Sequence, residues 1–267
     1  MYDYHLHTRY SMDSDAAVES MIQAAIDKGI KEIAVTDHID YEFPNPGGNL
    51  WVVDMDDYLE TLAQMQQKYR GQIVIRRGIE LGIQESCLDR CLRFYEQYKR
   101  ELDFIIASRH AIGGVDPYEV NLFQSNRRHQ CYEEYFEAVA SMVQLFPYAS
   151  VYGHLDYLVR YDPGEEKYSY EEFAPLLDQI LTQIIANGAG IELNTSGYRV
   201  GLGRPLPPWN IVQRYRELGG TILTTGSDAH SPEDVGLSME TCYQTLRSMG
   251  FTSISTFHER KAMAVPL

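Results

Sequence analysis

Short apolar runs alternate with helical patterns along most of the chain. The runs are rich in Ile, Val, Leu and Tyr, and after each of them apolar residues recur every three or four positions. Seven strands are predicted in this way, namely YDYHLH, IKEIAVTDH, QIVIRRGIEL, DFIIASRH, SVYGHLD, GAGIELNTSG and TILTTGSDAH. Because strands that alternate with helices pair in parallel, the pattern predicts an α/β fold, either an open doubly wound sheet or a closed barrel of the TIM type.

Helices are predicted between these strands. They cover residues 15–28, the stretches DMDDYLETLAQMQQKYRG, ESCLDRCLRFYEQYKRE and QCYEEYFEAVASMVQLF, and residues 170–187 and 208–218. Asp15 or Ser14 is expected to cap the first helix and Gly29 to end it. A Pro- and Gly-rich loop, FPNPGGN, precedes the second helix, but no linker or repeat divides the chain, which predicts one domain over residues 1–267.

Composition and charge narrow the function classes. The share of hydrophobic residues is 44%, which is ordinary for a globular protein, and no apolar run approaches the length of a membrane span. A net charge of −15 would repel a nucleic acid backbone. We therefore expect neither a nucleic acid nor a membrane partner. An acidic protein that handles a small anion must compensate the charge locally, and clustered divalent cations are one way to do so.

The cysteines point to a reducing environment. There are four of them, Cys87, Cys91, Cys131 and Cys242, and they do not form the spacing of a disulfide framework. The first residues also lack a basic segment followed by an apolar stretch, so a cytoplasmic location is expected. Cys87 and Cys91 lie four residues apart on a predicted helix and are interpreted as half-buried thiols without a function.

Six of the eight histidines fall at the carboxyl end of a predicted strand. They are His5, His7, His38, His110, His154 and His230, and two acidic residues, Glu80 and Asp228, follow the same rule. In a parallel barrel these ends share the face on which such folds carry their chemistry. His5 and His7 alternate along a strand, so their side chains point to the same side. The other two histidines, His129 and His258, are predicted to lie on the surface.

This grouping of polar residues predicts a metal centre. Any one histidine at a strand end is more often a hydrogen-bonded structural residue. A whole rim of imidazoles and carboxylates, however, is costly to bury unless cations hold it. Nitrogen combined with carboxylate ligation suits zinc, iron or manganese, whereas magnesium and calcium favour oxygen ligands.

Six ordered motifs resemble the PHP family, named for polymerases and histidinol phosphatases. They are HLHT, TDH, GIEL, SRH, GHLD and SDAHSPEDVG, and the resemblance runs from Tyr2 to about Gly236. The length and the NTSGYR segment make the chain most similar to the histidinol-phosphatase branch. The resemblance implies a distorted barrel of seven βα units, which agrees with the seven predicted strands.

The resemblance also implies two or three divalent transition metals, zinc, manganese or iron. Carried over by motif, the first metal falls to His5, His7, Glu80 and Asp228, the second to Glu80, His110 and His154, and the third to His38 and His230. Many members of the family have a further histidine at the third site, and the matching position here is Asp13. An aspartate is an oxygen ligand, so this departure bears on the affinity and identity of the third metal. Asp13 is alternatively an ordinary residue that leads into a helix.

The implied reaction is hydrolysis of a small phosphate monoester, most closely L-histidinol phosphate to histidinol and phosphate. Our hypothesis is that hydroxide held between the first and second metals attacks phosphorus directly. The third metal, or His38 and His230 in its absence, would stabilise the leaving oxygen. Together with the ligands Glu80 and Asp228, these two histidines are the predicted catalytic residues.

Two arginines are candidates for phosphate binding. Arg160 in GHLDYLVR and Arg199 in NTSGYR carry guanidinium groups, which hold phosphate oxygens bidentately. Either is alternatively a surface arginine. Asp156 follows His154 by two residues and is suitably placed to orient a metal ligand. Two rival functions stay open, a phosphoesterase for nucleotides, sugar phosphates or phosphotyrosine, and a metal-binding regulatory protein without turnover.

Overall fold

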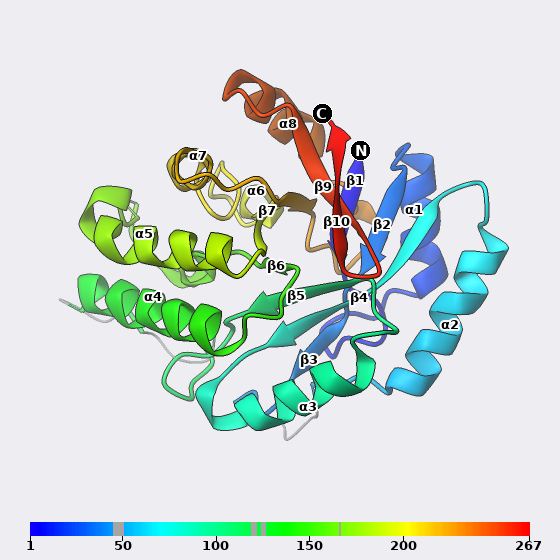
Figure 1. Cartoon of the computed structure of the whole chain (residues 1–267), viewed down its shortest axis with the longest axis horizontal. Helices are drawn as coiled ribbons and strands as arrows, with labels where there is room; N and C mark the ends of the chain where they lie inside the picture. The colour runs from blue at the N-terminus through cyan, green and yellow to red at the C-terminus, as the bar shows by residue number, and fades with distance from the viewer. Residues whose placement is uncertain (45–50, 119–121, 124–126, 166) are drawn as a thin grey trace.

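A nearly closed barrel of parallel strands forms the centre of the molecule (Figure 1). The computed structural model describes residues 1–44, 51–118, 122–123, 127–165 and 167–267. The sheet order is β1 (Tyr2–Leu6), β2 (Glu32–Val35), β4 (Val74–Gly82), β5 (Phe104–Ser108), β6 (Val151–Tyr152), β7 (Gly190–Asn194) and β8 (Leu223–Gly226). Closure between the first and last strands is made by His7 N, which donates to the Ala229 carbonyl at 2.9 Å, and by Asp228 N, which donates to the His5 carbonyl at 2.9 Å. The predicted barrel is therefore confirmed over the open sheet.

Amphipathic helices surround the barrel on its outside (Figure 1). They are α1 (Val18–Asp27), α2 (Met55–Lys68), α3 (Leu88–Tyr98), α4 (Arg128–Leu145), α5 (Tyr170–Ala186), α7 (Trp209–Glu217) and α8 (Met239–Ser248), with a single turn, α6 (Ser196–Arg199), after β7. Their starts follow local sequence chemistry. Asp54 caps α2 through its side chain, and Ser169 and Glu172 form a capping box at α5.

The first helix begins later in the structure than the sequence predicts. The first helix starts at Val18 rather than at residue 15, and neither Asp15 nor Ser14 caps it. Instead the Ser14 hydroxyl donates to the carbonyl of His230 at 2.8 Å, which ties the segment before the helix to the end of β8. Gly29 follows the helix with a φ of +69°, as expected for a residue that ends a helix.

The second predicted strand is interrupted. It consists of β2 and of β3 (His38–Asp40), which pairs in parallel with the far end of β4. At the break, the Asp37 carboxylate accepts hydrogen bonds from Thr8 N at 2.6 Å and from the Ser11 hydroxyl at 2.7 Å. These side-chain contacts replace the ladder locally and carry His38 onto the same rim as the end of β1.

A carboxyl-terminal hairpin, absent from the sequence predictions, covers the amino-terminal end of the barrel. It consists of β9 (Ser253–His258) and β10 (Lys261–Pro266). The Phe257 ring lies 5.0 Å from the ring of Phe104, and Phe257 N donates to the Tyr4 hydroxyl at 2.8 Å. The interior at this end is an apolar cluster of Tyr4, Ala34, Phe104, Ile106, Val151 and Phe257.

A bulge in β1 separates this apolar interior from the rim. The register of β1 against β2 shifts between Asp3 and Leu6, so β1 carries one residue more than its partner. Consequently Tyr4 joins the interior cluster while the next residue, His5, also reaches the barrel interior, and Leu6 packs in the outer core. His5 and His7 point to the same side, as predicted, with their Nε2 atoms 3.0 Å apart.

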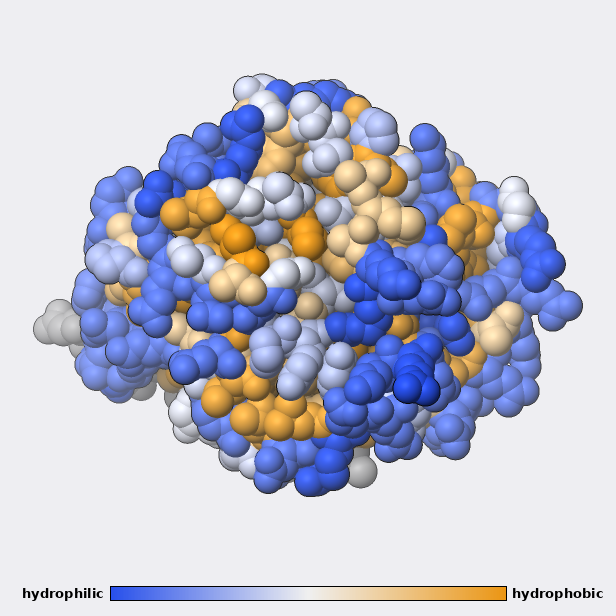
Figure 2. All heavy atoms as spheres, in the orientation of Figure 1, coloured by the Kyte–Doolittle hydropathy of each residue, from blue (hydrophilic) through white to orange (hydrophobic). Residues whose placement is uncertain are grey.

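The surface of the molecule and the burial of single residues test the remaining predictions. Hydrophilic residues cover much of the face shown in Figure 2, with apolar residues in separate groups between them. None of the helices in the described ranges has both the length and the apolar character of a membrane span. His129 and His258 are exposed as predicted, whereas Cys87 and Cys91 are fully rather than half buried. The FPNPGGN loop lies mostly outside the described residues.

Candidate metal centre

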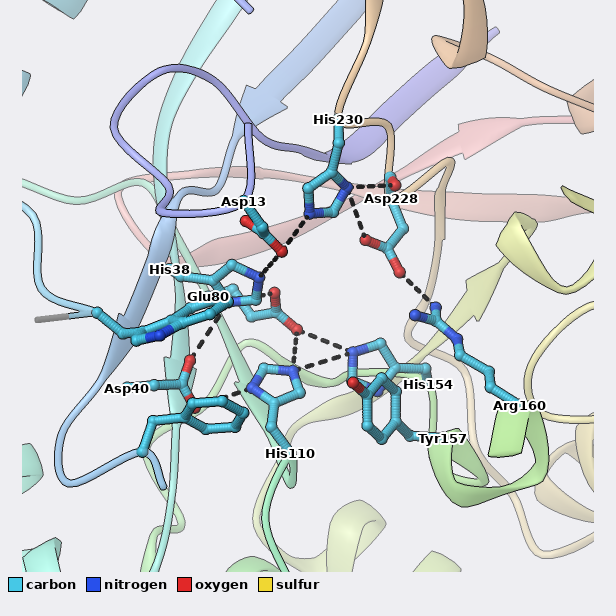
Figure 3. A pocket seen from close by; sticks show the side chains of 12 residues that line it. Asp13, His38, Asp40, Glu80, His110, His154, Tyr157, Arg160, Asp228 and His230 are labelled. Carbon is cyan, nitrogen blue, oxygen red and sulfur yellow. Dashed lines mark hydrogen bonds and ion pairs between the residues drawn. The ribbon is translucent and has the colours of Figure 1, made fainter. Parts of the chain in front are cut away.

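The predicted metal ligands meet at the carboxyl-terminal rim of the barrel, where all of them except His5 and His7 line one cavity (Figure 3). They are His5, His7, Asp13, His38, Glu80, His110, His154, Asp228 and His230. Most of them fall into groups of three or four whose ligand atoms lie within 4.8 Å of one another. The walls of the cavity add Phe43, Trp51, Tyr157 and Arg160. The expected meeting at one rim is observed, and metal binding by each residue stays a prediction.

Glu80 stands between two groups of imidazoles. Its Oε2 lies 3.0 Å from His5 Nε2 and 3.4 Å from His7 Nε2. Its Oε1 lies 3.1 Å from His110 Nε2 and 2.9 Å from His154 Nε2. Burial alone would raise the pKa of this carboxyl, but the surrounding histidines outweigh burial and hold the pKa well below its usual range. Each oxygen of one carboxylate therefore faces a separate set of nitrogen donors.

Asp228 completes the first group. Its Oδ1 lies 3.5 Å from His7 Nε2 and 3.8 Å from His5 Nε2. The backbone of Asp228 has a φ of +53°, a left-handed conformation that aspartate tolerates better than most residues. Burial would raise the pKa of the carboxyl, but Arg160 and His5 outweigh burial and hold it well below the usual value. The side chain is consequently an anion aimed at the first group.

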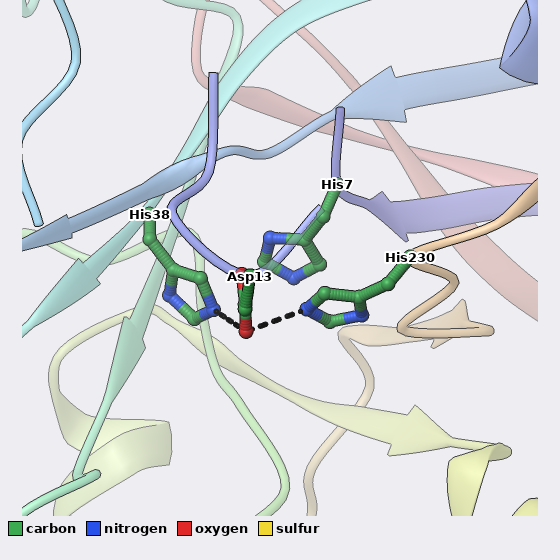
Figure 4. Close-up of side chains that lie close together, drawn as sticks. All are labelled: His7, Asp13, His38 and His230. Atoms are coloured by element: carbon green, nitrogen blue, oxygen red, sulfur yellow. Dashed lines mark hydrogen bonds and ion pairs between the residues drawn. The ribbon is translucent and has the colours of Figure 1, made fainter. Parts of the chain in front are cut away.

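The third group contains the aspartate that departs from the family pattern (Figure 4). Asp13 Oδ2 lies 3.0 Å from His230 Nε2 and 3.7 Å from His38 Nε2. The His7 ring stacks against the ring of His38, at 4.3 Å, and against the ring of His230, at 4.1 Å. The Asp13 carboxylate thus lies within reach of both imidazoles, where a ligand to the third metal is predicted. Its side chain is 38% exposed, whereas that of Glu80 is 1% exposed, so the third group is the open one.

Sequence reasoning missed three carboxylates that contact the histidines directly or through a hydroxyl. One of them, Asp40, also lines the cavity and forms a further candidate metal group with His38 and His110. Asp40 Oδ1 lies 2.9 Å from His110 Nδ1, and Glu192 Oε1 lies 2.6 Å from His5 Nδ1. Asp37 acts through the Ser11 hydroxyl, which lies 3.0 Å from Nδ1 of His7. An acidic residue inside an otherwise apolar predicted strand, as in GIELN for Glu192, is the sequence feature that could have identified such a residue.

Of the two arginines predicted to bind phosphate, one lines the cavity, and the aspartate predicted to orient a metal ligand contacts an arginine instead. Arg160 lines the cavity, and its Nη2 donates to Asp228 Oδ2 at 2.5 Å. Arg199 donates to the carbonyls of Ser227 and Asp228, at 3.2 and 2.7 Å, and is not among the described residues that line the cavity. Asp156 is fully buried against Arg204 at 3.0 Å, so its contacts lie away from the imidazole of His154.

The donor set fits divalent transition metals. His5 Nε2 and His7 Nε2 converge to 3.0 Å, and His110 Nε2 and His154 Nε2 to 3.4 Å. Nitrogen atoms that converge in this way can share a cation, and a carboxylate oxygen stands within 3.4 Å of each nitrogen. Mixed nitrogen and oxygen donors at a buried site are typical of zinc, manganese and iron.

Comparison with known proteins identifies the family. The PHP domain matches residues 3–196, and the chain belongs to this family. It is 29% identical to the probable histidinol-phosphatase of Clostridium acetobutylicum over 98% of both chains, and 28% identical to the histidinol-phosphatase of Lactococcus lactis over 97% of this chain and 95% of that protein. The crystal structure of the Lactococcus lactis histidinol phosphate phosphatase, complexed with zinc, L-histidinol and phosphate, superposes with a TM-score of 0.87 over 98% of both chains.

These findings define the class of the protein. It is an enzyme, a histidinol-phosphatase-like phosphoesterase of the PHP family, and its fold is the distorted barrel that the sequence predicted. The clustered buried histidines and carboxylates agree with a metal-dependent phosphatase that has several metal sites.

Proposed function

We propose that residues 1–267 form one phosphoesterase domain that hydrolyses L-histidinol phosphate to histidinol and phosphate. The observation that carries the proposal is the placement of Glu80, whose two oxygens face two separate groups of imidazoles at the floor of one cavity. The substrate is inferred from the Lactococcus lactis relative, which holds L-histidinol and phosphate. The four cysteines are free, which is consistent with a reducing cytoplasm.

The residues present would hold two or three ions of zinc, manganese or iron. His5, His7, Glu80 and Asp228 would hold the first, Glu80, His110 and His154 the second, and Asp13, His38 and His230, with His7 beside them, the third. When bound, such ions activate water for attack on phosphorus and neutralise charge on the phosphate oxygens.

Arg160 would bind the phosphate group. Its guanidinium lies over the Tyr157 ring at 4.8 Å, and both side chains line the cavity. Its Nη2 is held by Asp228 and by the Ser196 hydroxyl, so its other N–H groups would make the contacts to the phosphate oxygens. The contact with Asp228 holds the guanidinium at the wall of the cavity that Glu80 also lines.

His38 and His230 would stand beside the leaving oxygen. Both side chains line the cavity, and that of His230 is 26% exposed, so it meets solvent at the mouth. Hydrolysis breaks the bond between phosphorus and the ester oxygen, water supplies the new oxygen, and the departing alcohol gains a proton. Without an ion at the third site, an imidazole at this position would supply or relay that proton.

The test is a panel of phosphate esters with released phosphate as the readout. We expect kcat/KM for L-histidinol phosphate to exceed the values for nucleotides, sugar phosphates and phosphotyrosine by about 100-fold or more, because a site that binds a polar substrate group rejects analogues that lack it. Equal turnover of all esters would overturn the substrate assignment and leave a general phosphoesterase. A metal-loaded protein that releases no phosphate from any ester would overturn the enzymatic proposal for these substrates.

A further inference from the structure

Glu192 on β7 contacts both groups of metal-ligand residues that share Glu80. The side chain is 1% exposed. Its Oε1 lies 2.6 Å from His5 Nδ1 in the first group. Its Oε2 accepts from the backbone N–H of His154, in the second group, at 2.9 Å and from Asn194 Nδ2 at 3.1 Å. One buried carboxylate therefore spans two strands that each deliver a metal-type ligand.

The neighbouring strands leave room for this carboxylate by placing glycine on both sides of it. A Cβ atom at Gly226, on β8, would lie 2.3 Å from Glu192 Oε1 and 2.4 Å from His5 Cβ. A Cβ atom at Gly153, after β6, would lie 3.4 Å from Glu192 Oε2 and only 2.6 Å from the Ser108 hydroxyl. Any larger residue at Gly226 would displace the carboxylate from His5. The contact is thus built by three adjacent strands, β6, β7 and β8.

The contact decides which nitrogen of His5 is free. An ionised carboxylate only accepts hydrogen bonds, so the proton of a neutral His5 ring sits on Nδ1 and points at Glu192. The lone pair is then on Nε2, which faces His7 Nε2 at 3.0 Å and Glu80 Oε2 at 3.0 Å. A carboxylate behind a metal-binding histidine fixes the orientation of the ring and makes it a stronger ligand.

We propose that Glu192 is a positioning residue that fixes the tautomer of His5 and the backbone of His154, and thereby sets the spacing of the two metal sites on either side of Glu80. His154 Nε2 lies 2.9 Å from Glu80 Oε1, so the two ends of the Glu192 carboxylate act on opposite oxygens of Glu80. The proposal rests on the metal-dependent function proposed above. It does not depend on which phosphate ester is the substrate.

The test is Glu192→Gln, which keeps the size of the side chain but replaces one acceptor by a donor. That donor would face His5 Nδ1 or the N–H of His154, both of which also donate. We expect the zinc affinity of both sites to fall by about 10- to 100-fold, measured by competition with a chromophoric chelator. KM should change less than kcat, because Glu192 is not among the described residues that line the cavity.

Glu32→Gln is the matched control. Glu32 is another buried glutamate of the barrel, 8% exposed, but it contacts Tyr4 and Arg76 at the opposite end. We expect this variant to unfold at a lower temperature and to bind zinc with native affinity. Glu192→Gln with native affinity at both sites, and with a loss of stability like that of Glu32→Gln, would overturn the proposal and make Glu192 a structural glutamate.

The tautomer gives a second readout that a structural role would not move. In the zinc-loaded protein, long-range proton–nitrogen NMR should show the His5 proton on Nδ1 in a strong hydrogen bond, and this signal should be lost in Glu192→Gln. If Glu192→Gln does not fold, Glu192→Asp serves for both measurements, because the shorter side chain retracts the carboxylate from His5. An unchanged His5 signal and unchanged zinc affinity would overturn the proposal.

Reduced zinc affinity without turnover of L-histidinol phosphate by the native enzyme would support the positioning role and refute only the substrate assignment.

Discussion

The two ends of the barrel are built from the same strands and have opposite chemistry. At the amino-terminal end, Tyr4, Phe104 and Phe257 pack ring against ring beneath the hairpin of β9 and β10. At the carboxyl-terminal end, the interior is filled by histidines and carboxylates around Glu80. In β1 the change occurs between consecutive residues, because Tyr4 belongs to one end and His5 to the other.

The comparison shows that the two ends of the barrel serve different purposes, because one end stabilises the fold and the other carries the polar groups of the site. Apolar burial at one end contributes free energy of folding without any demand on charge. Burial of ionisable groups at the other end is unfavourable unless opposite charges and cations compensate it. The barrel therefore confines its costly polar groups to the rim that faces the cavity, and the following changes should affect one end and not the other.

The largest loss of activity is expected from Glu80→Gln. Because this carboxylate faces both groups of imidazoles, its neutralisation should lower kcat/KM by about 10³-fold or more and reduce the metal content. Steady-state kinetics and elemental analysis measure the two effects. The unfolding temperature of the metal-free variant should stay near that of the metal-free native protein. Turnover and metal content close to native would contradict the assignment of Glu80 as a bridge.

Removal of metal should abolish activity reversibly. Dialysis against a strong chelator should stop phosphate release, and zinc, manganese or iron should restore it. Metal-free protein should also unfold more easily, because an ion present at about 1,000 times its Kd contributes about 4 kcal/mol to the free energy of unfolding. The open third group should lose its ion first, since the Asp13 side chain is 38% exposed. Full activity after complete removal of transition metals would refute the metal-dependent mechanism.

Arg160→Ala should impair catalysis without emptying the metal sites. Loss of a charge-assisted contact to phosphate corresponds to about a 10- to 100-fold decrease in kcat/KM. Arg199→Ala is the comparison, because Arg199 contacts the carbonyls behind Asp228 and should have the smaller effect. Elemental analysis should show native metal content in Arg160→Ala. A loss of metal in that variant would give Arg160 a role in holding Asp228 rather than phosphate.

The smallest effect on catalysis is expected from Phe257→Ala at the opposite end. Removing a buried ring from the apolar cluster should lower the free energy of unfolding by about 3 to 5 kcal/mol. Chemical denaturation measures this loss, and kcat per folded molecule should stay within about twofold of native, since the cluster lies away from the rim. A large loss of metal affinity in Phe257→Ala would show that the two ends are coupled.

The sequence predicted the rim better than it predicted the other end. Position at a strand end is decided by local periodicity, so His38, His110 and His154 were identified from their neighbours alone. The contacts of Asp40 and Glu192 depend on which strands lie side by side, and local patterning does not contain that information. The interruption between β2 and β3 was missed because Thr36 and Asp37 are satisfied by residues near His7, far away in the chain.

The carboxyl-terminal hairpin escaped prediction for a similar reason. Its strands contain few large apolar residues, and Phe257 becomes a core residue only because the barrel presents Tyr4 and Phe104 to it. The first helix was predicted to begin too early because Ser14 resembles a cap, whereas its hydroxyl is used by His230. In both cases a distant partner outweighs a local preference.

The place of β1 between β2 and β8 means that the barrel closes only when its first and last strands meet. Ser227 N donates to Asp3 Oδ1 across 224 residues, so the opening strand has a neighbour on one side only until the final turn of the barrel has been synthesised. Contacts of such long range carry a high cost in loop-closure entropy and slow folding. The proposed first metal site, which combines His5 and His7 with Asp228, would therefore be completed only when the barrel closes.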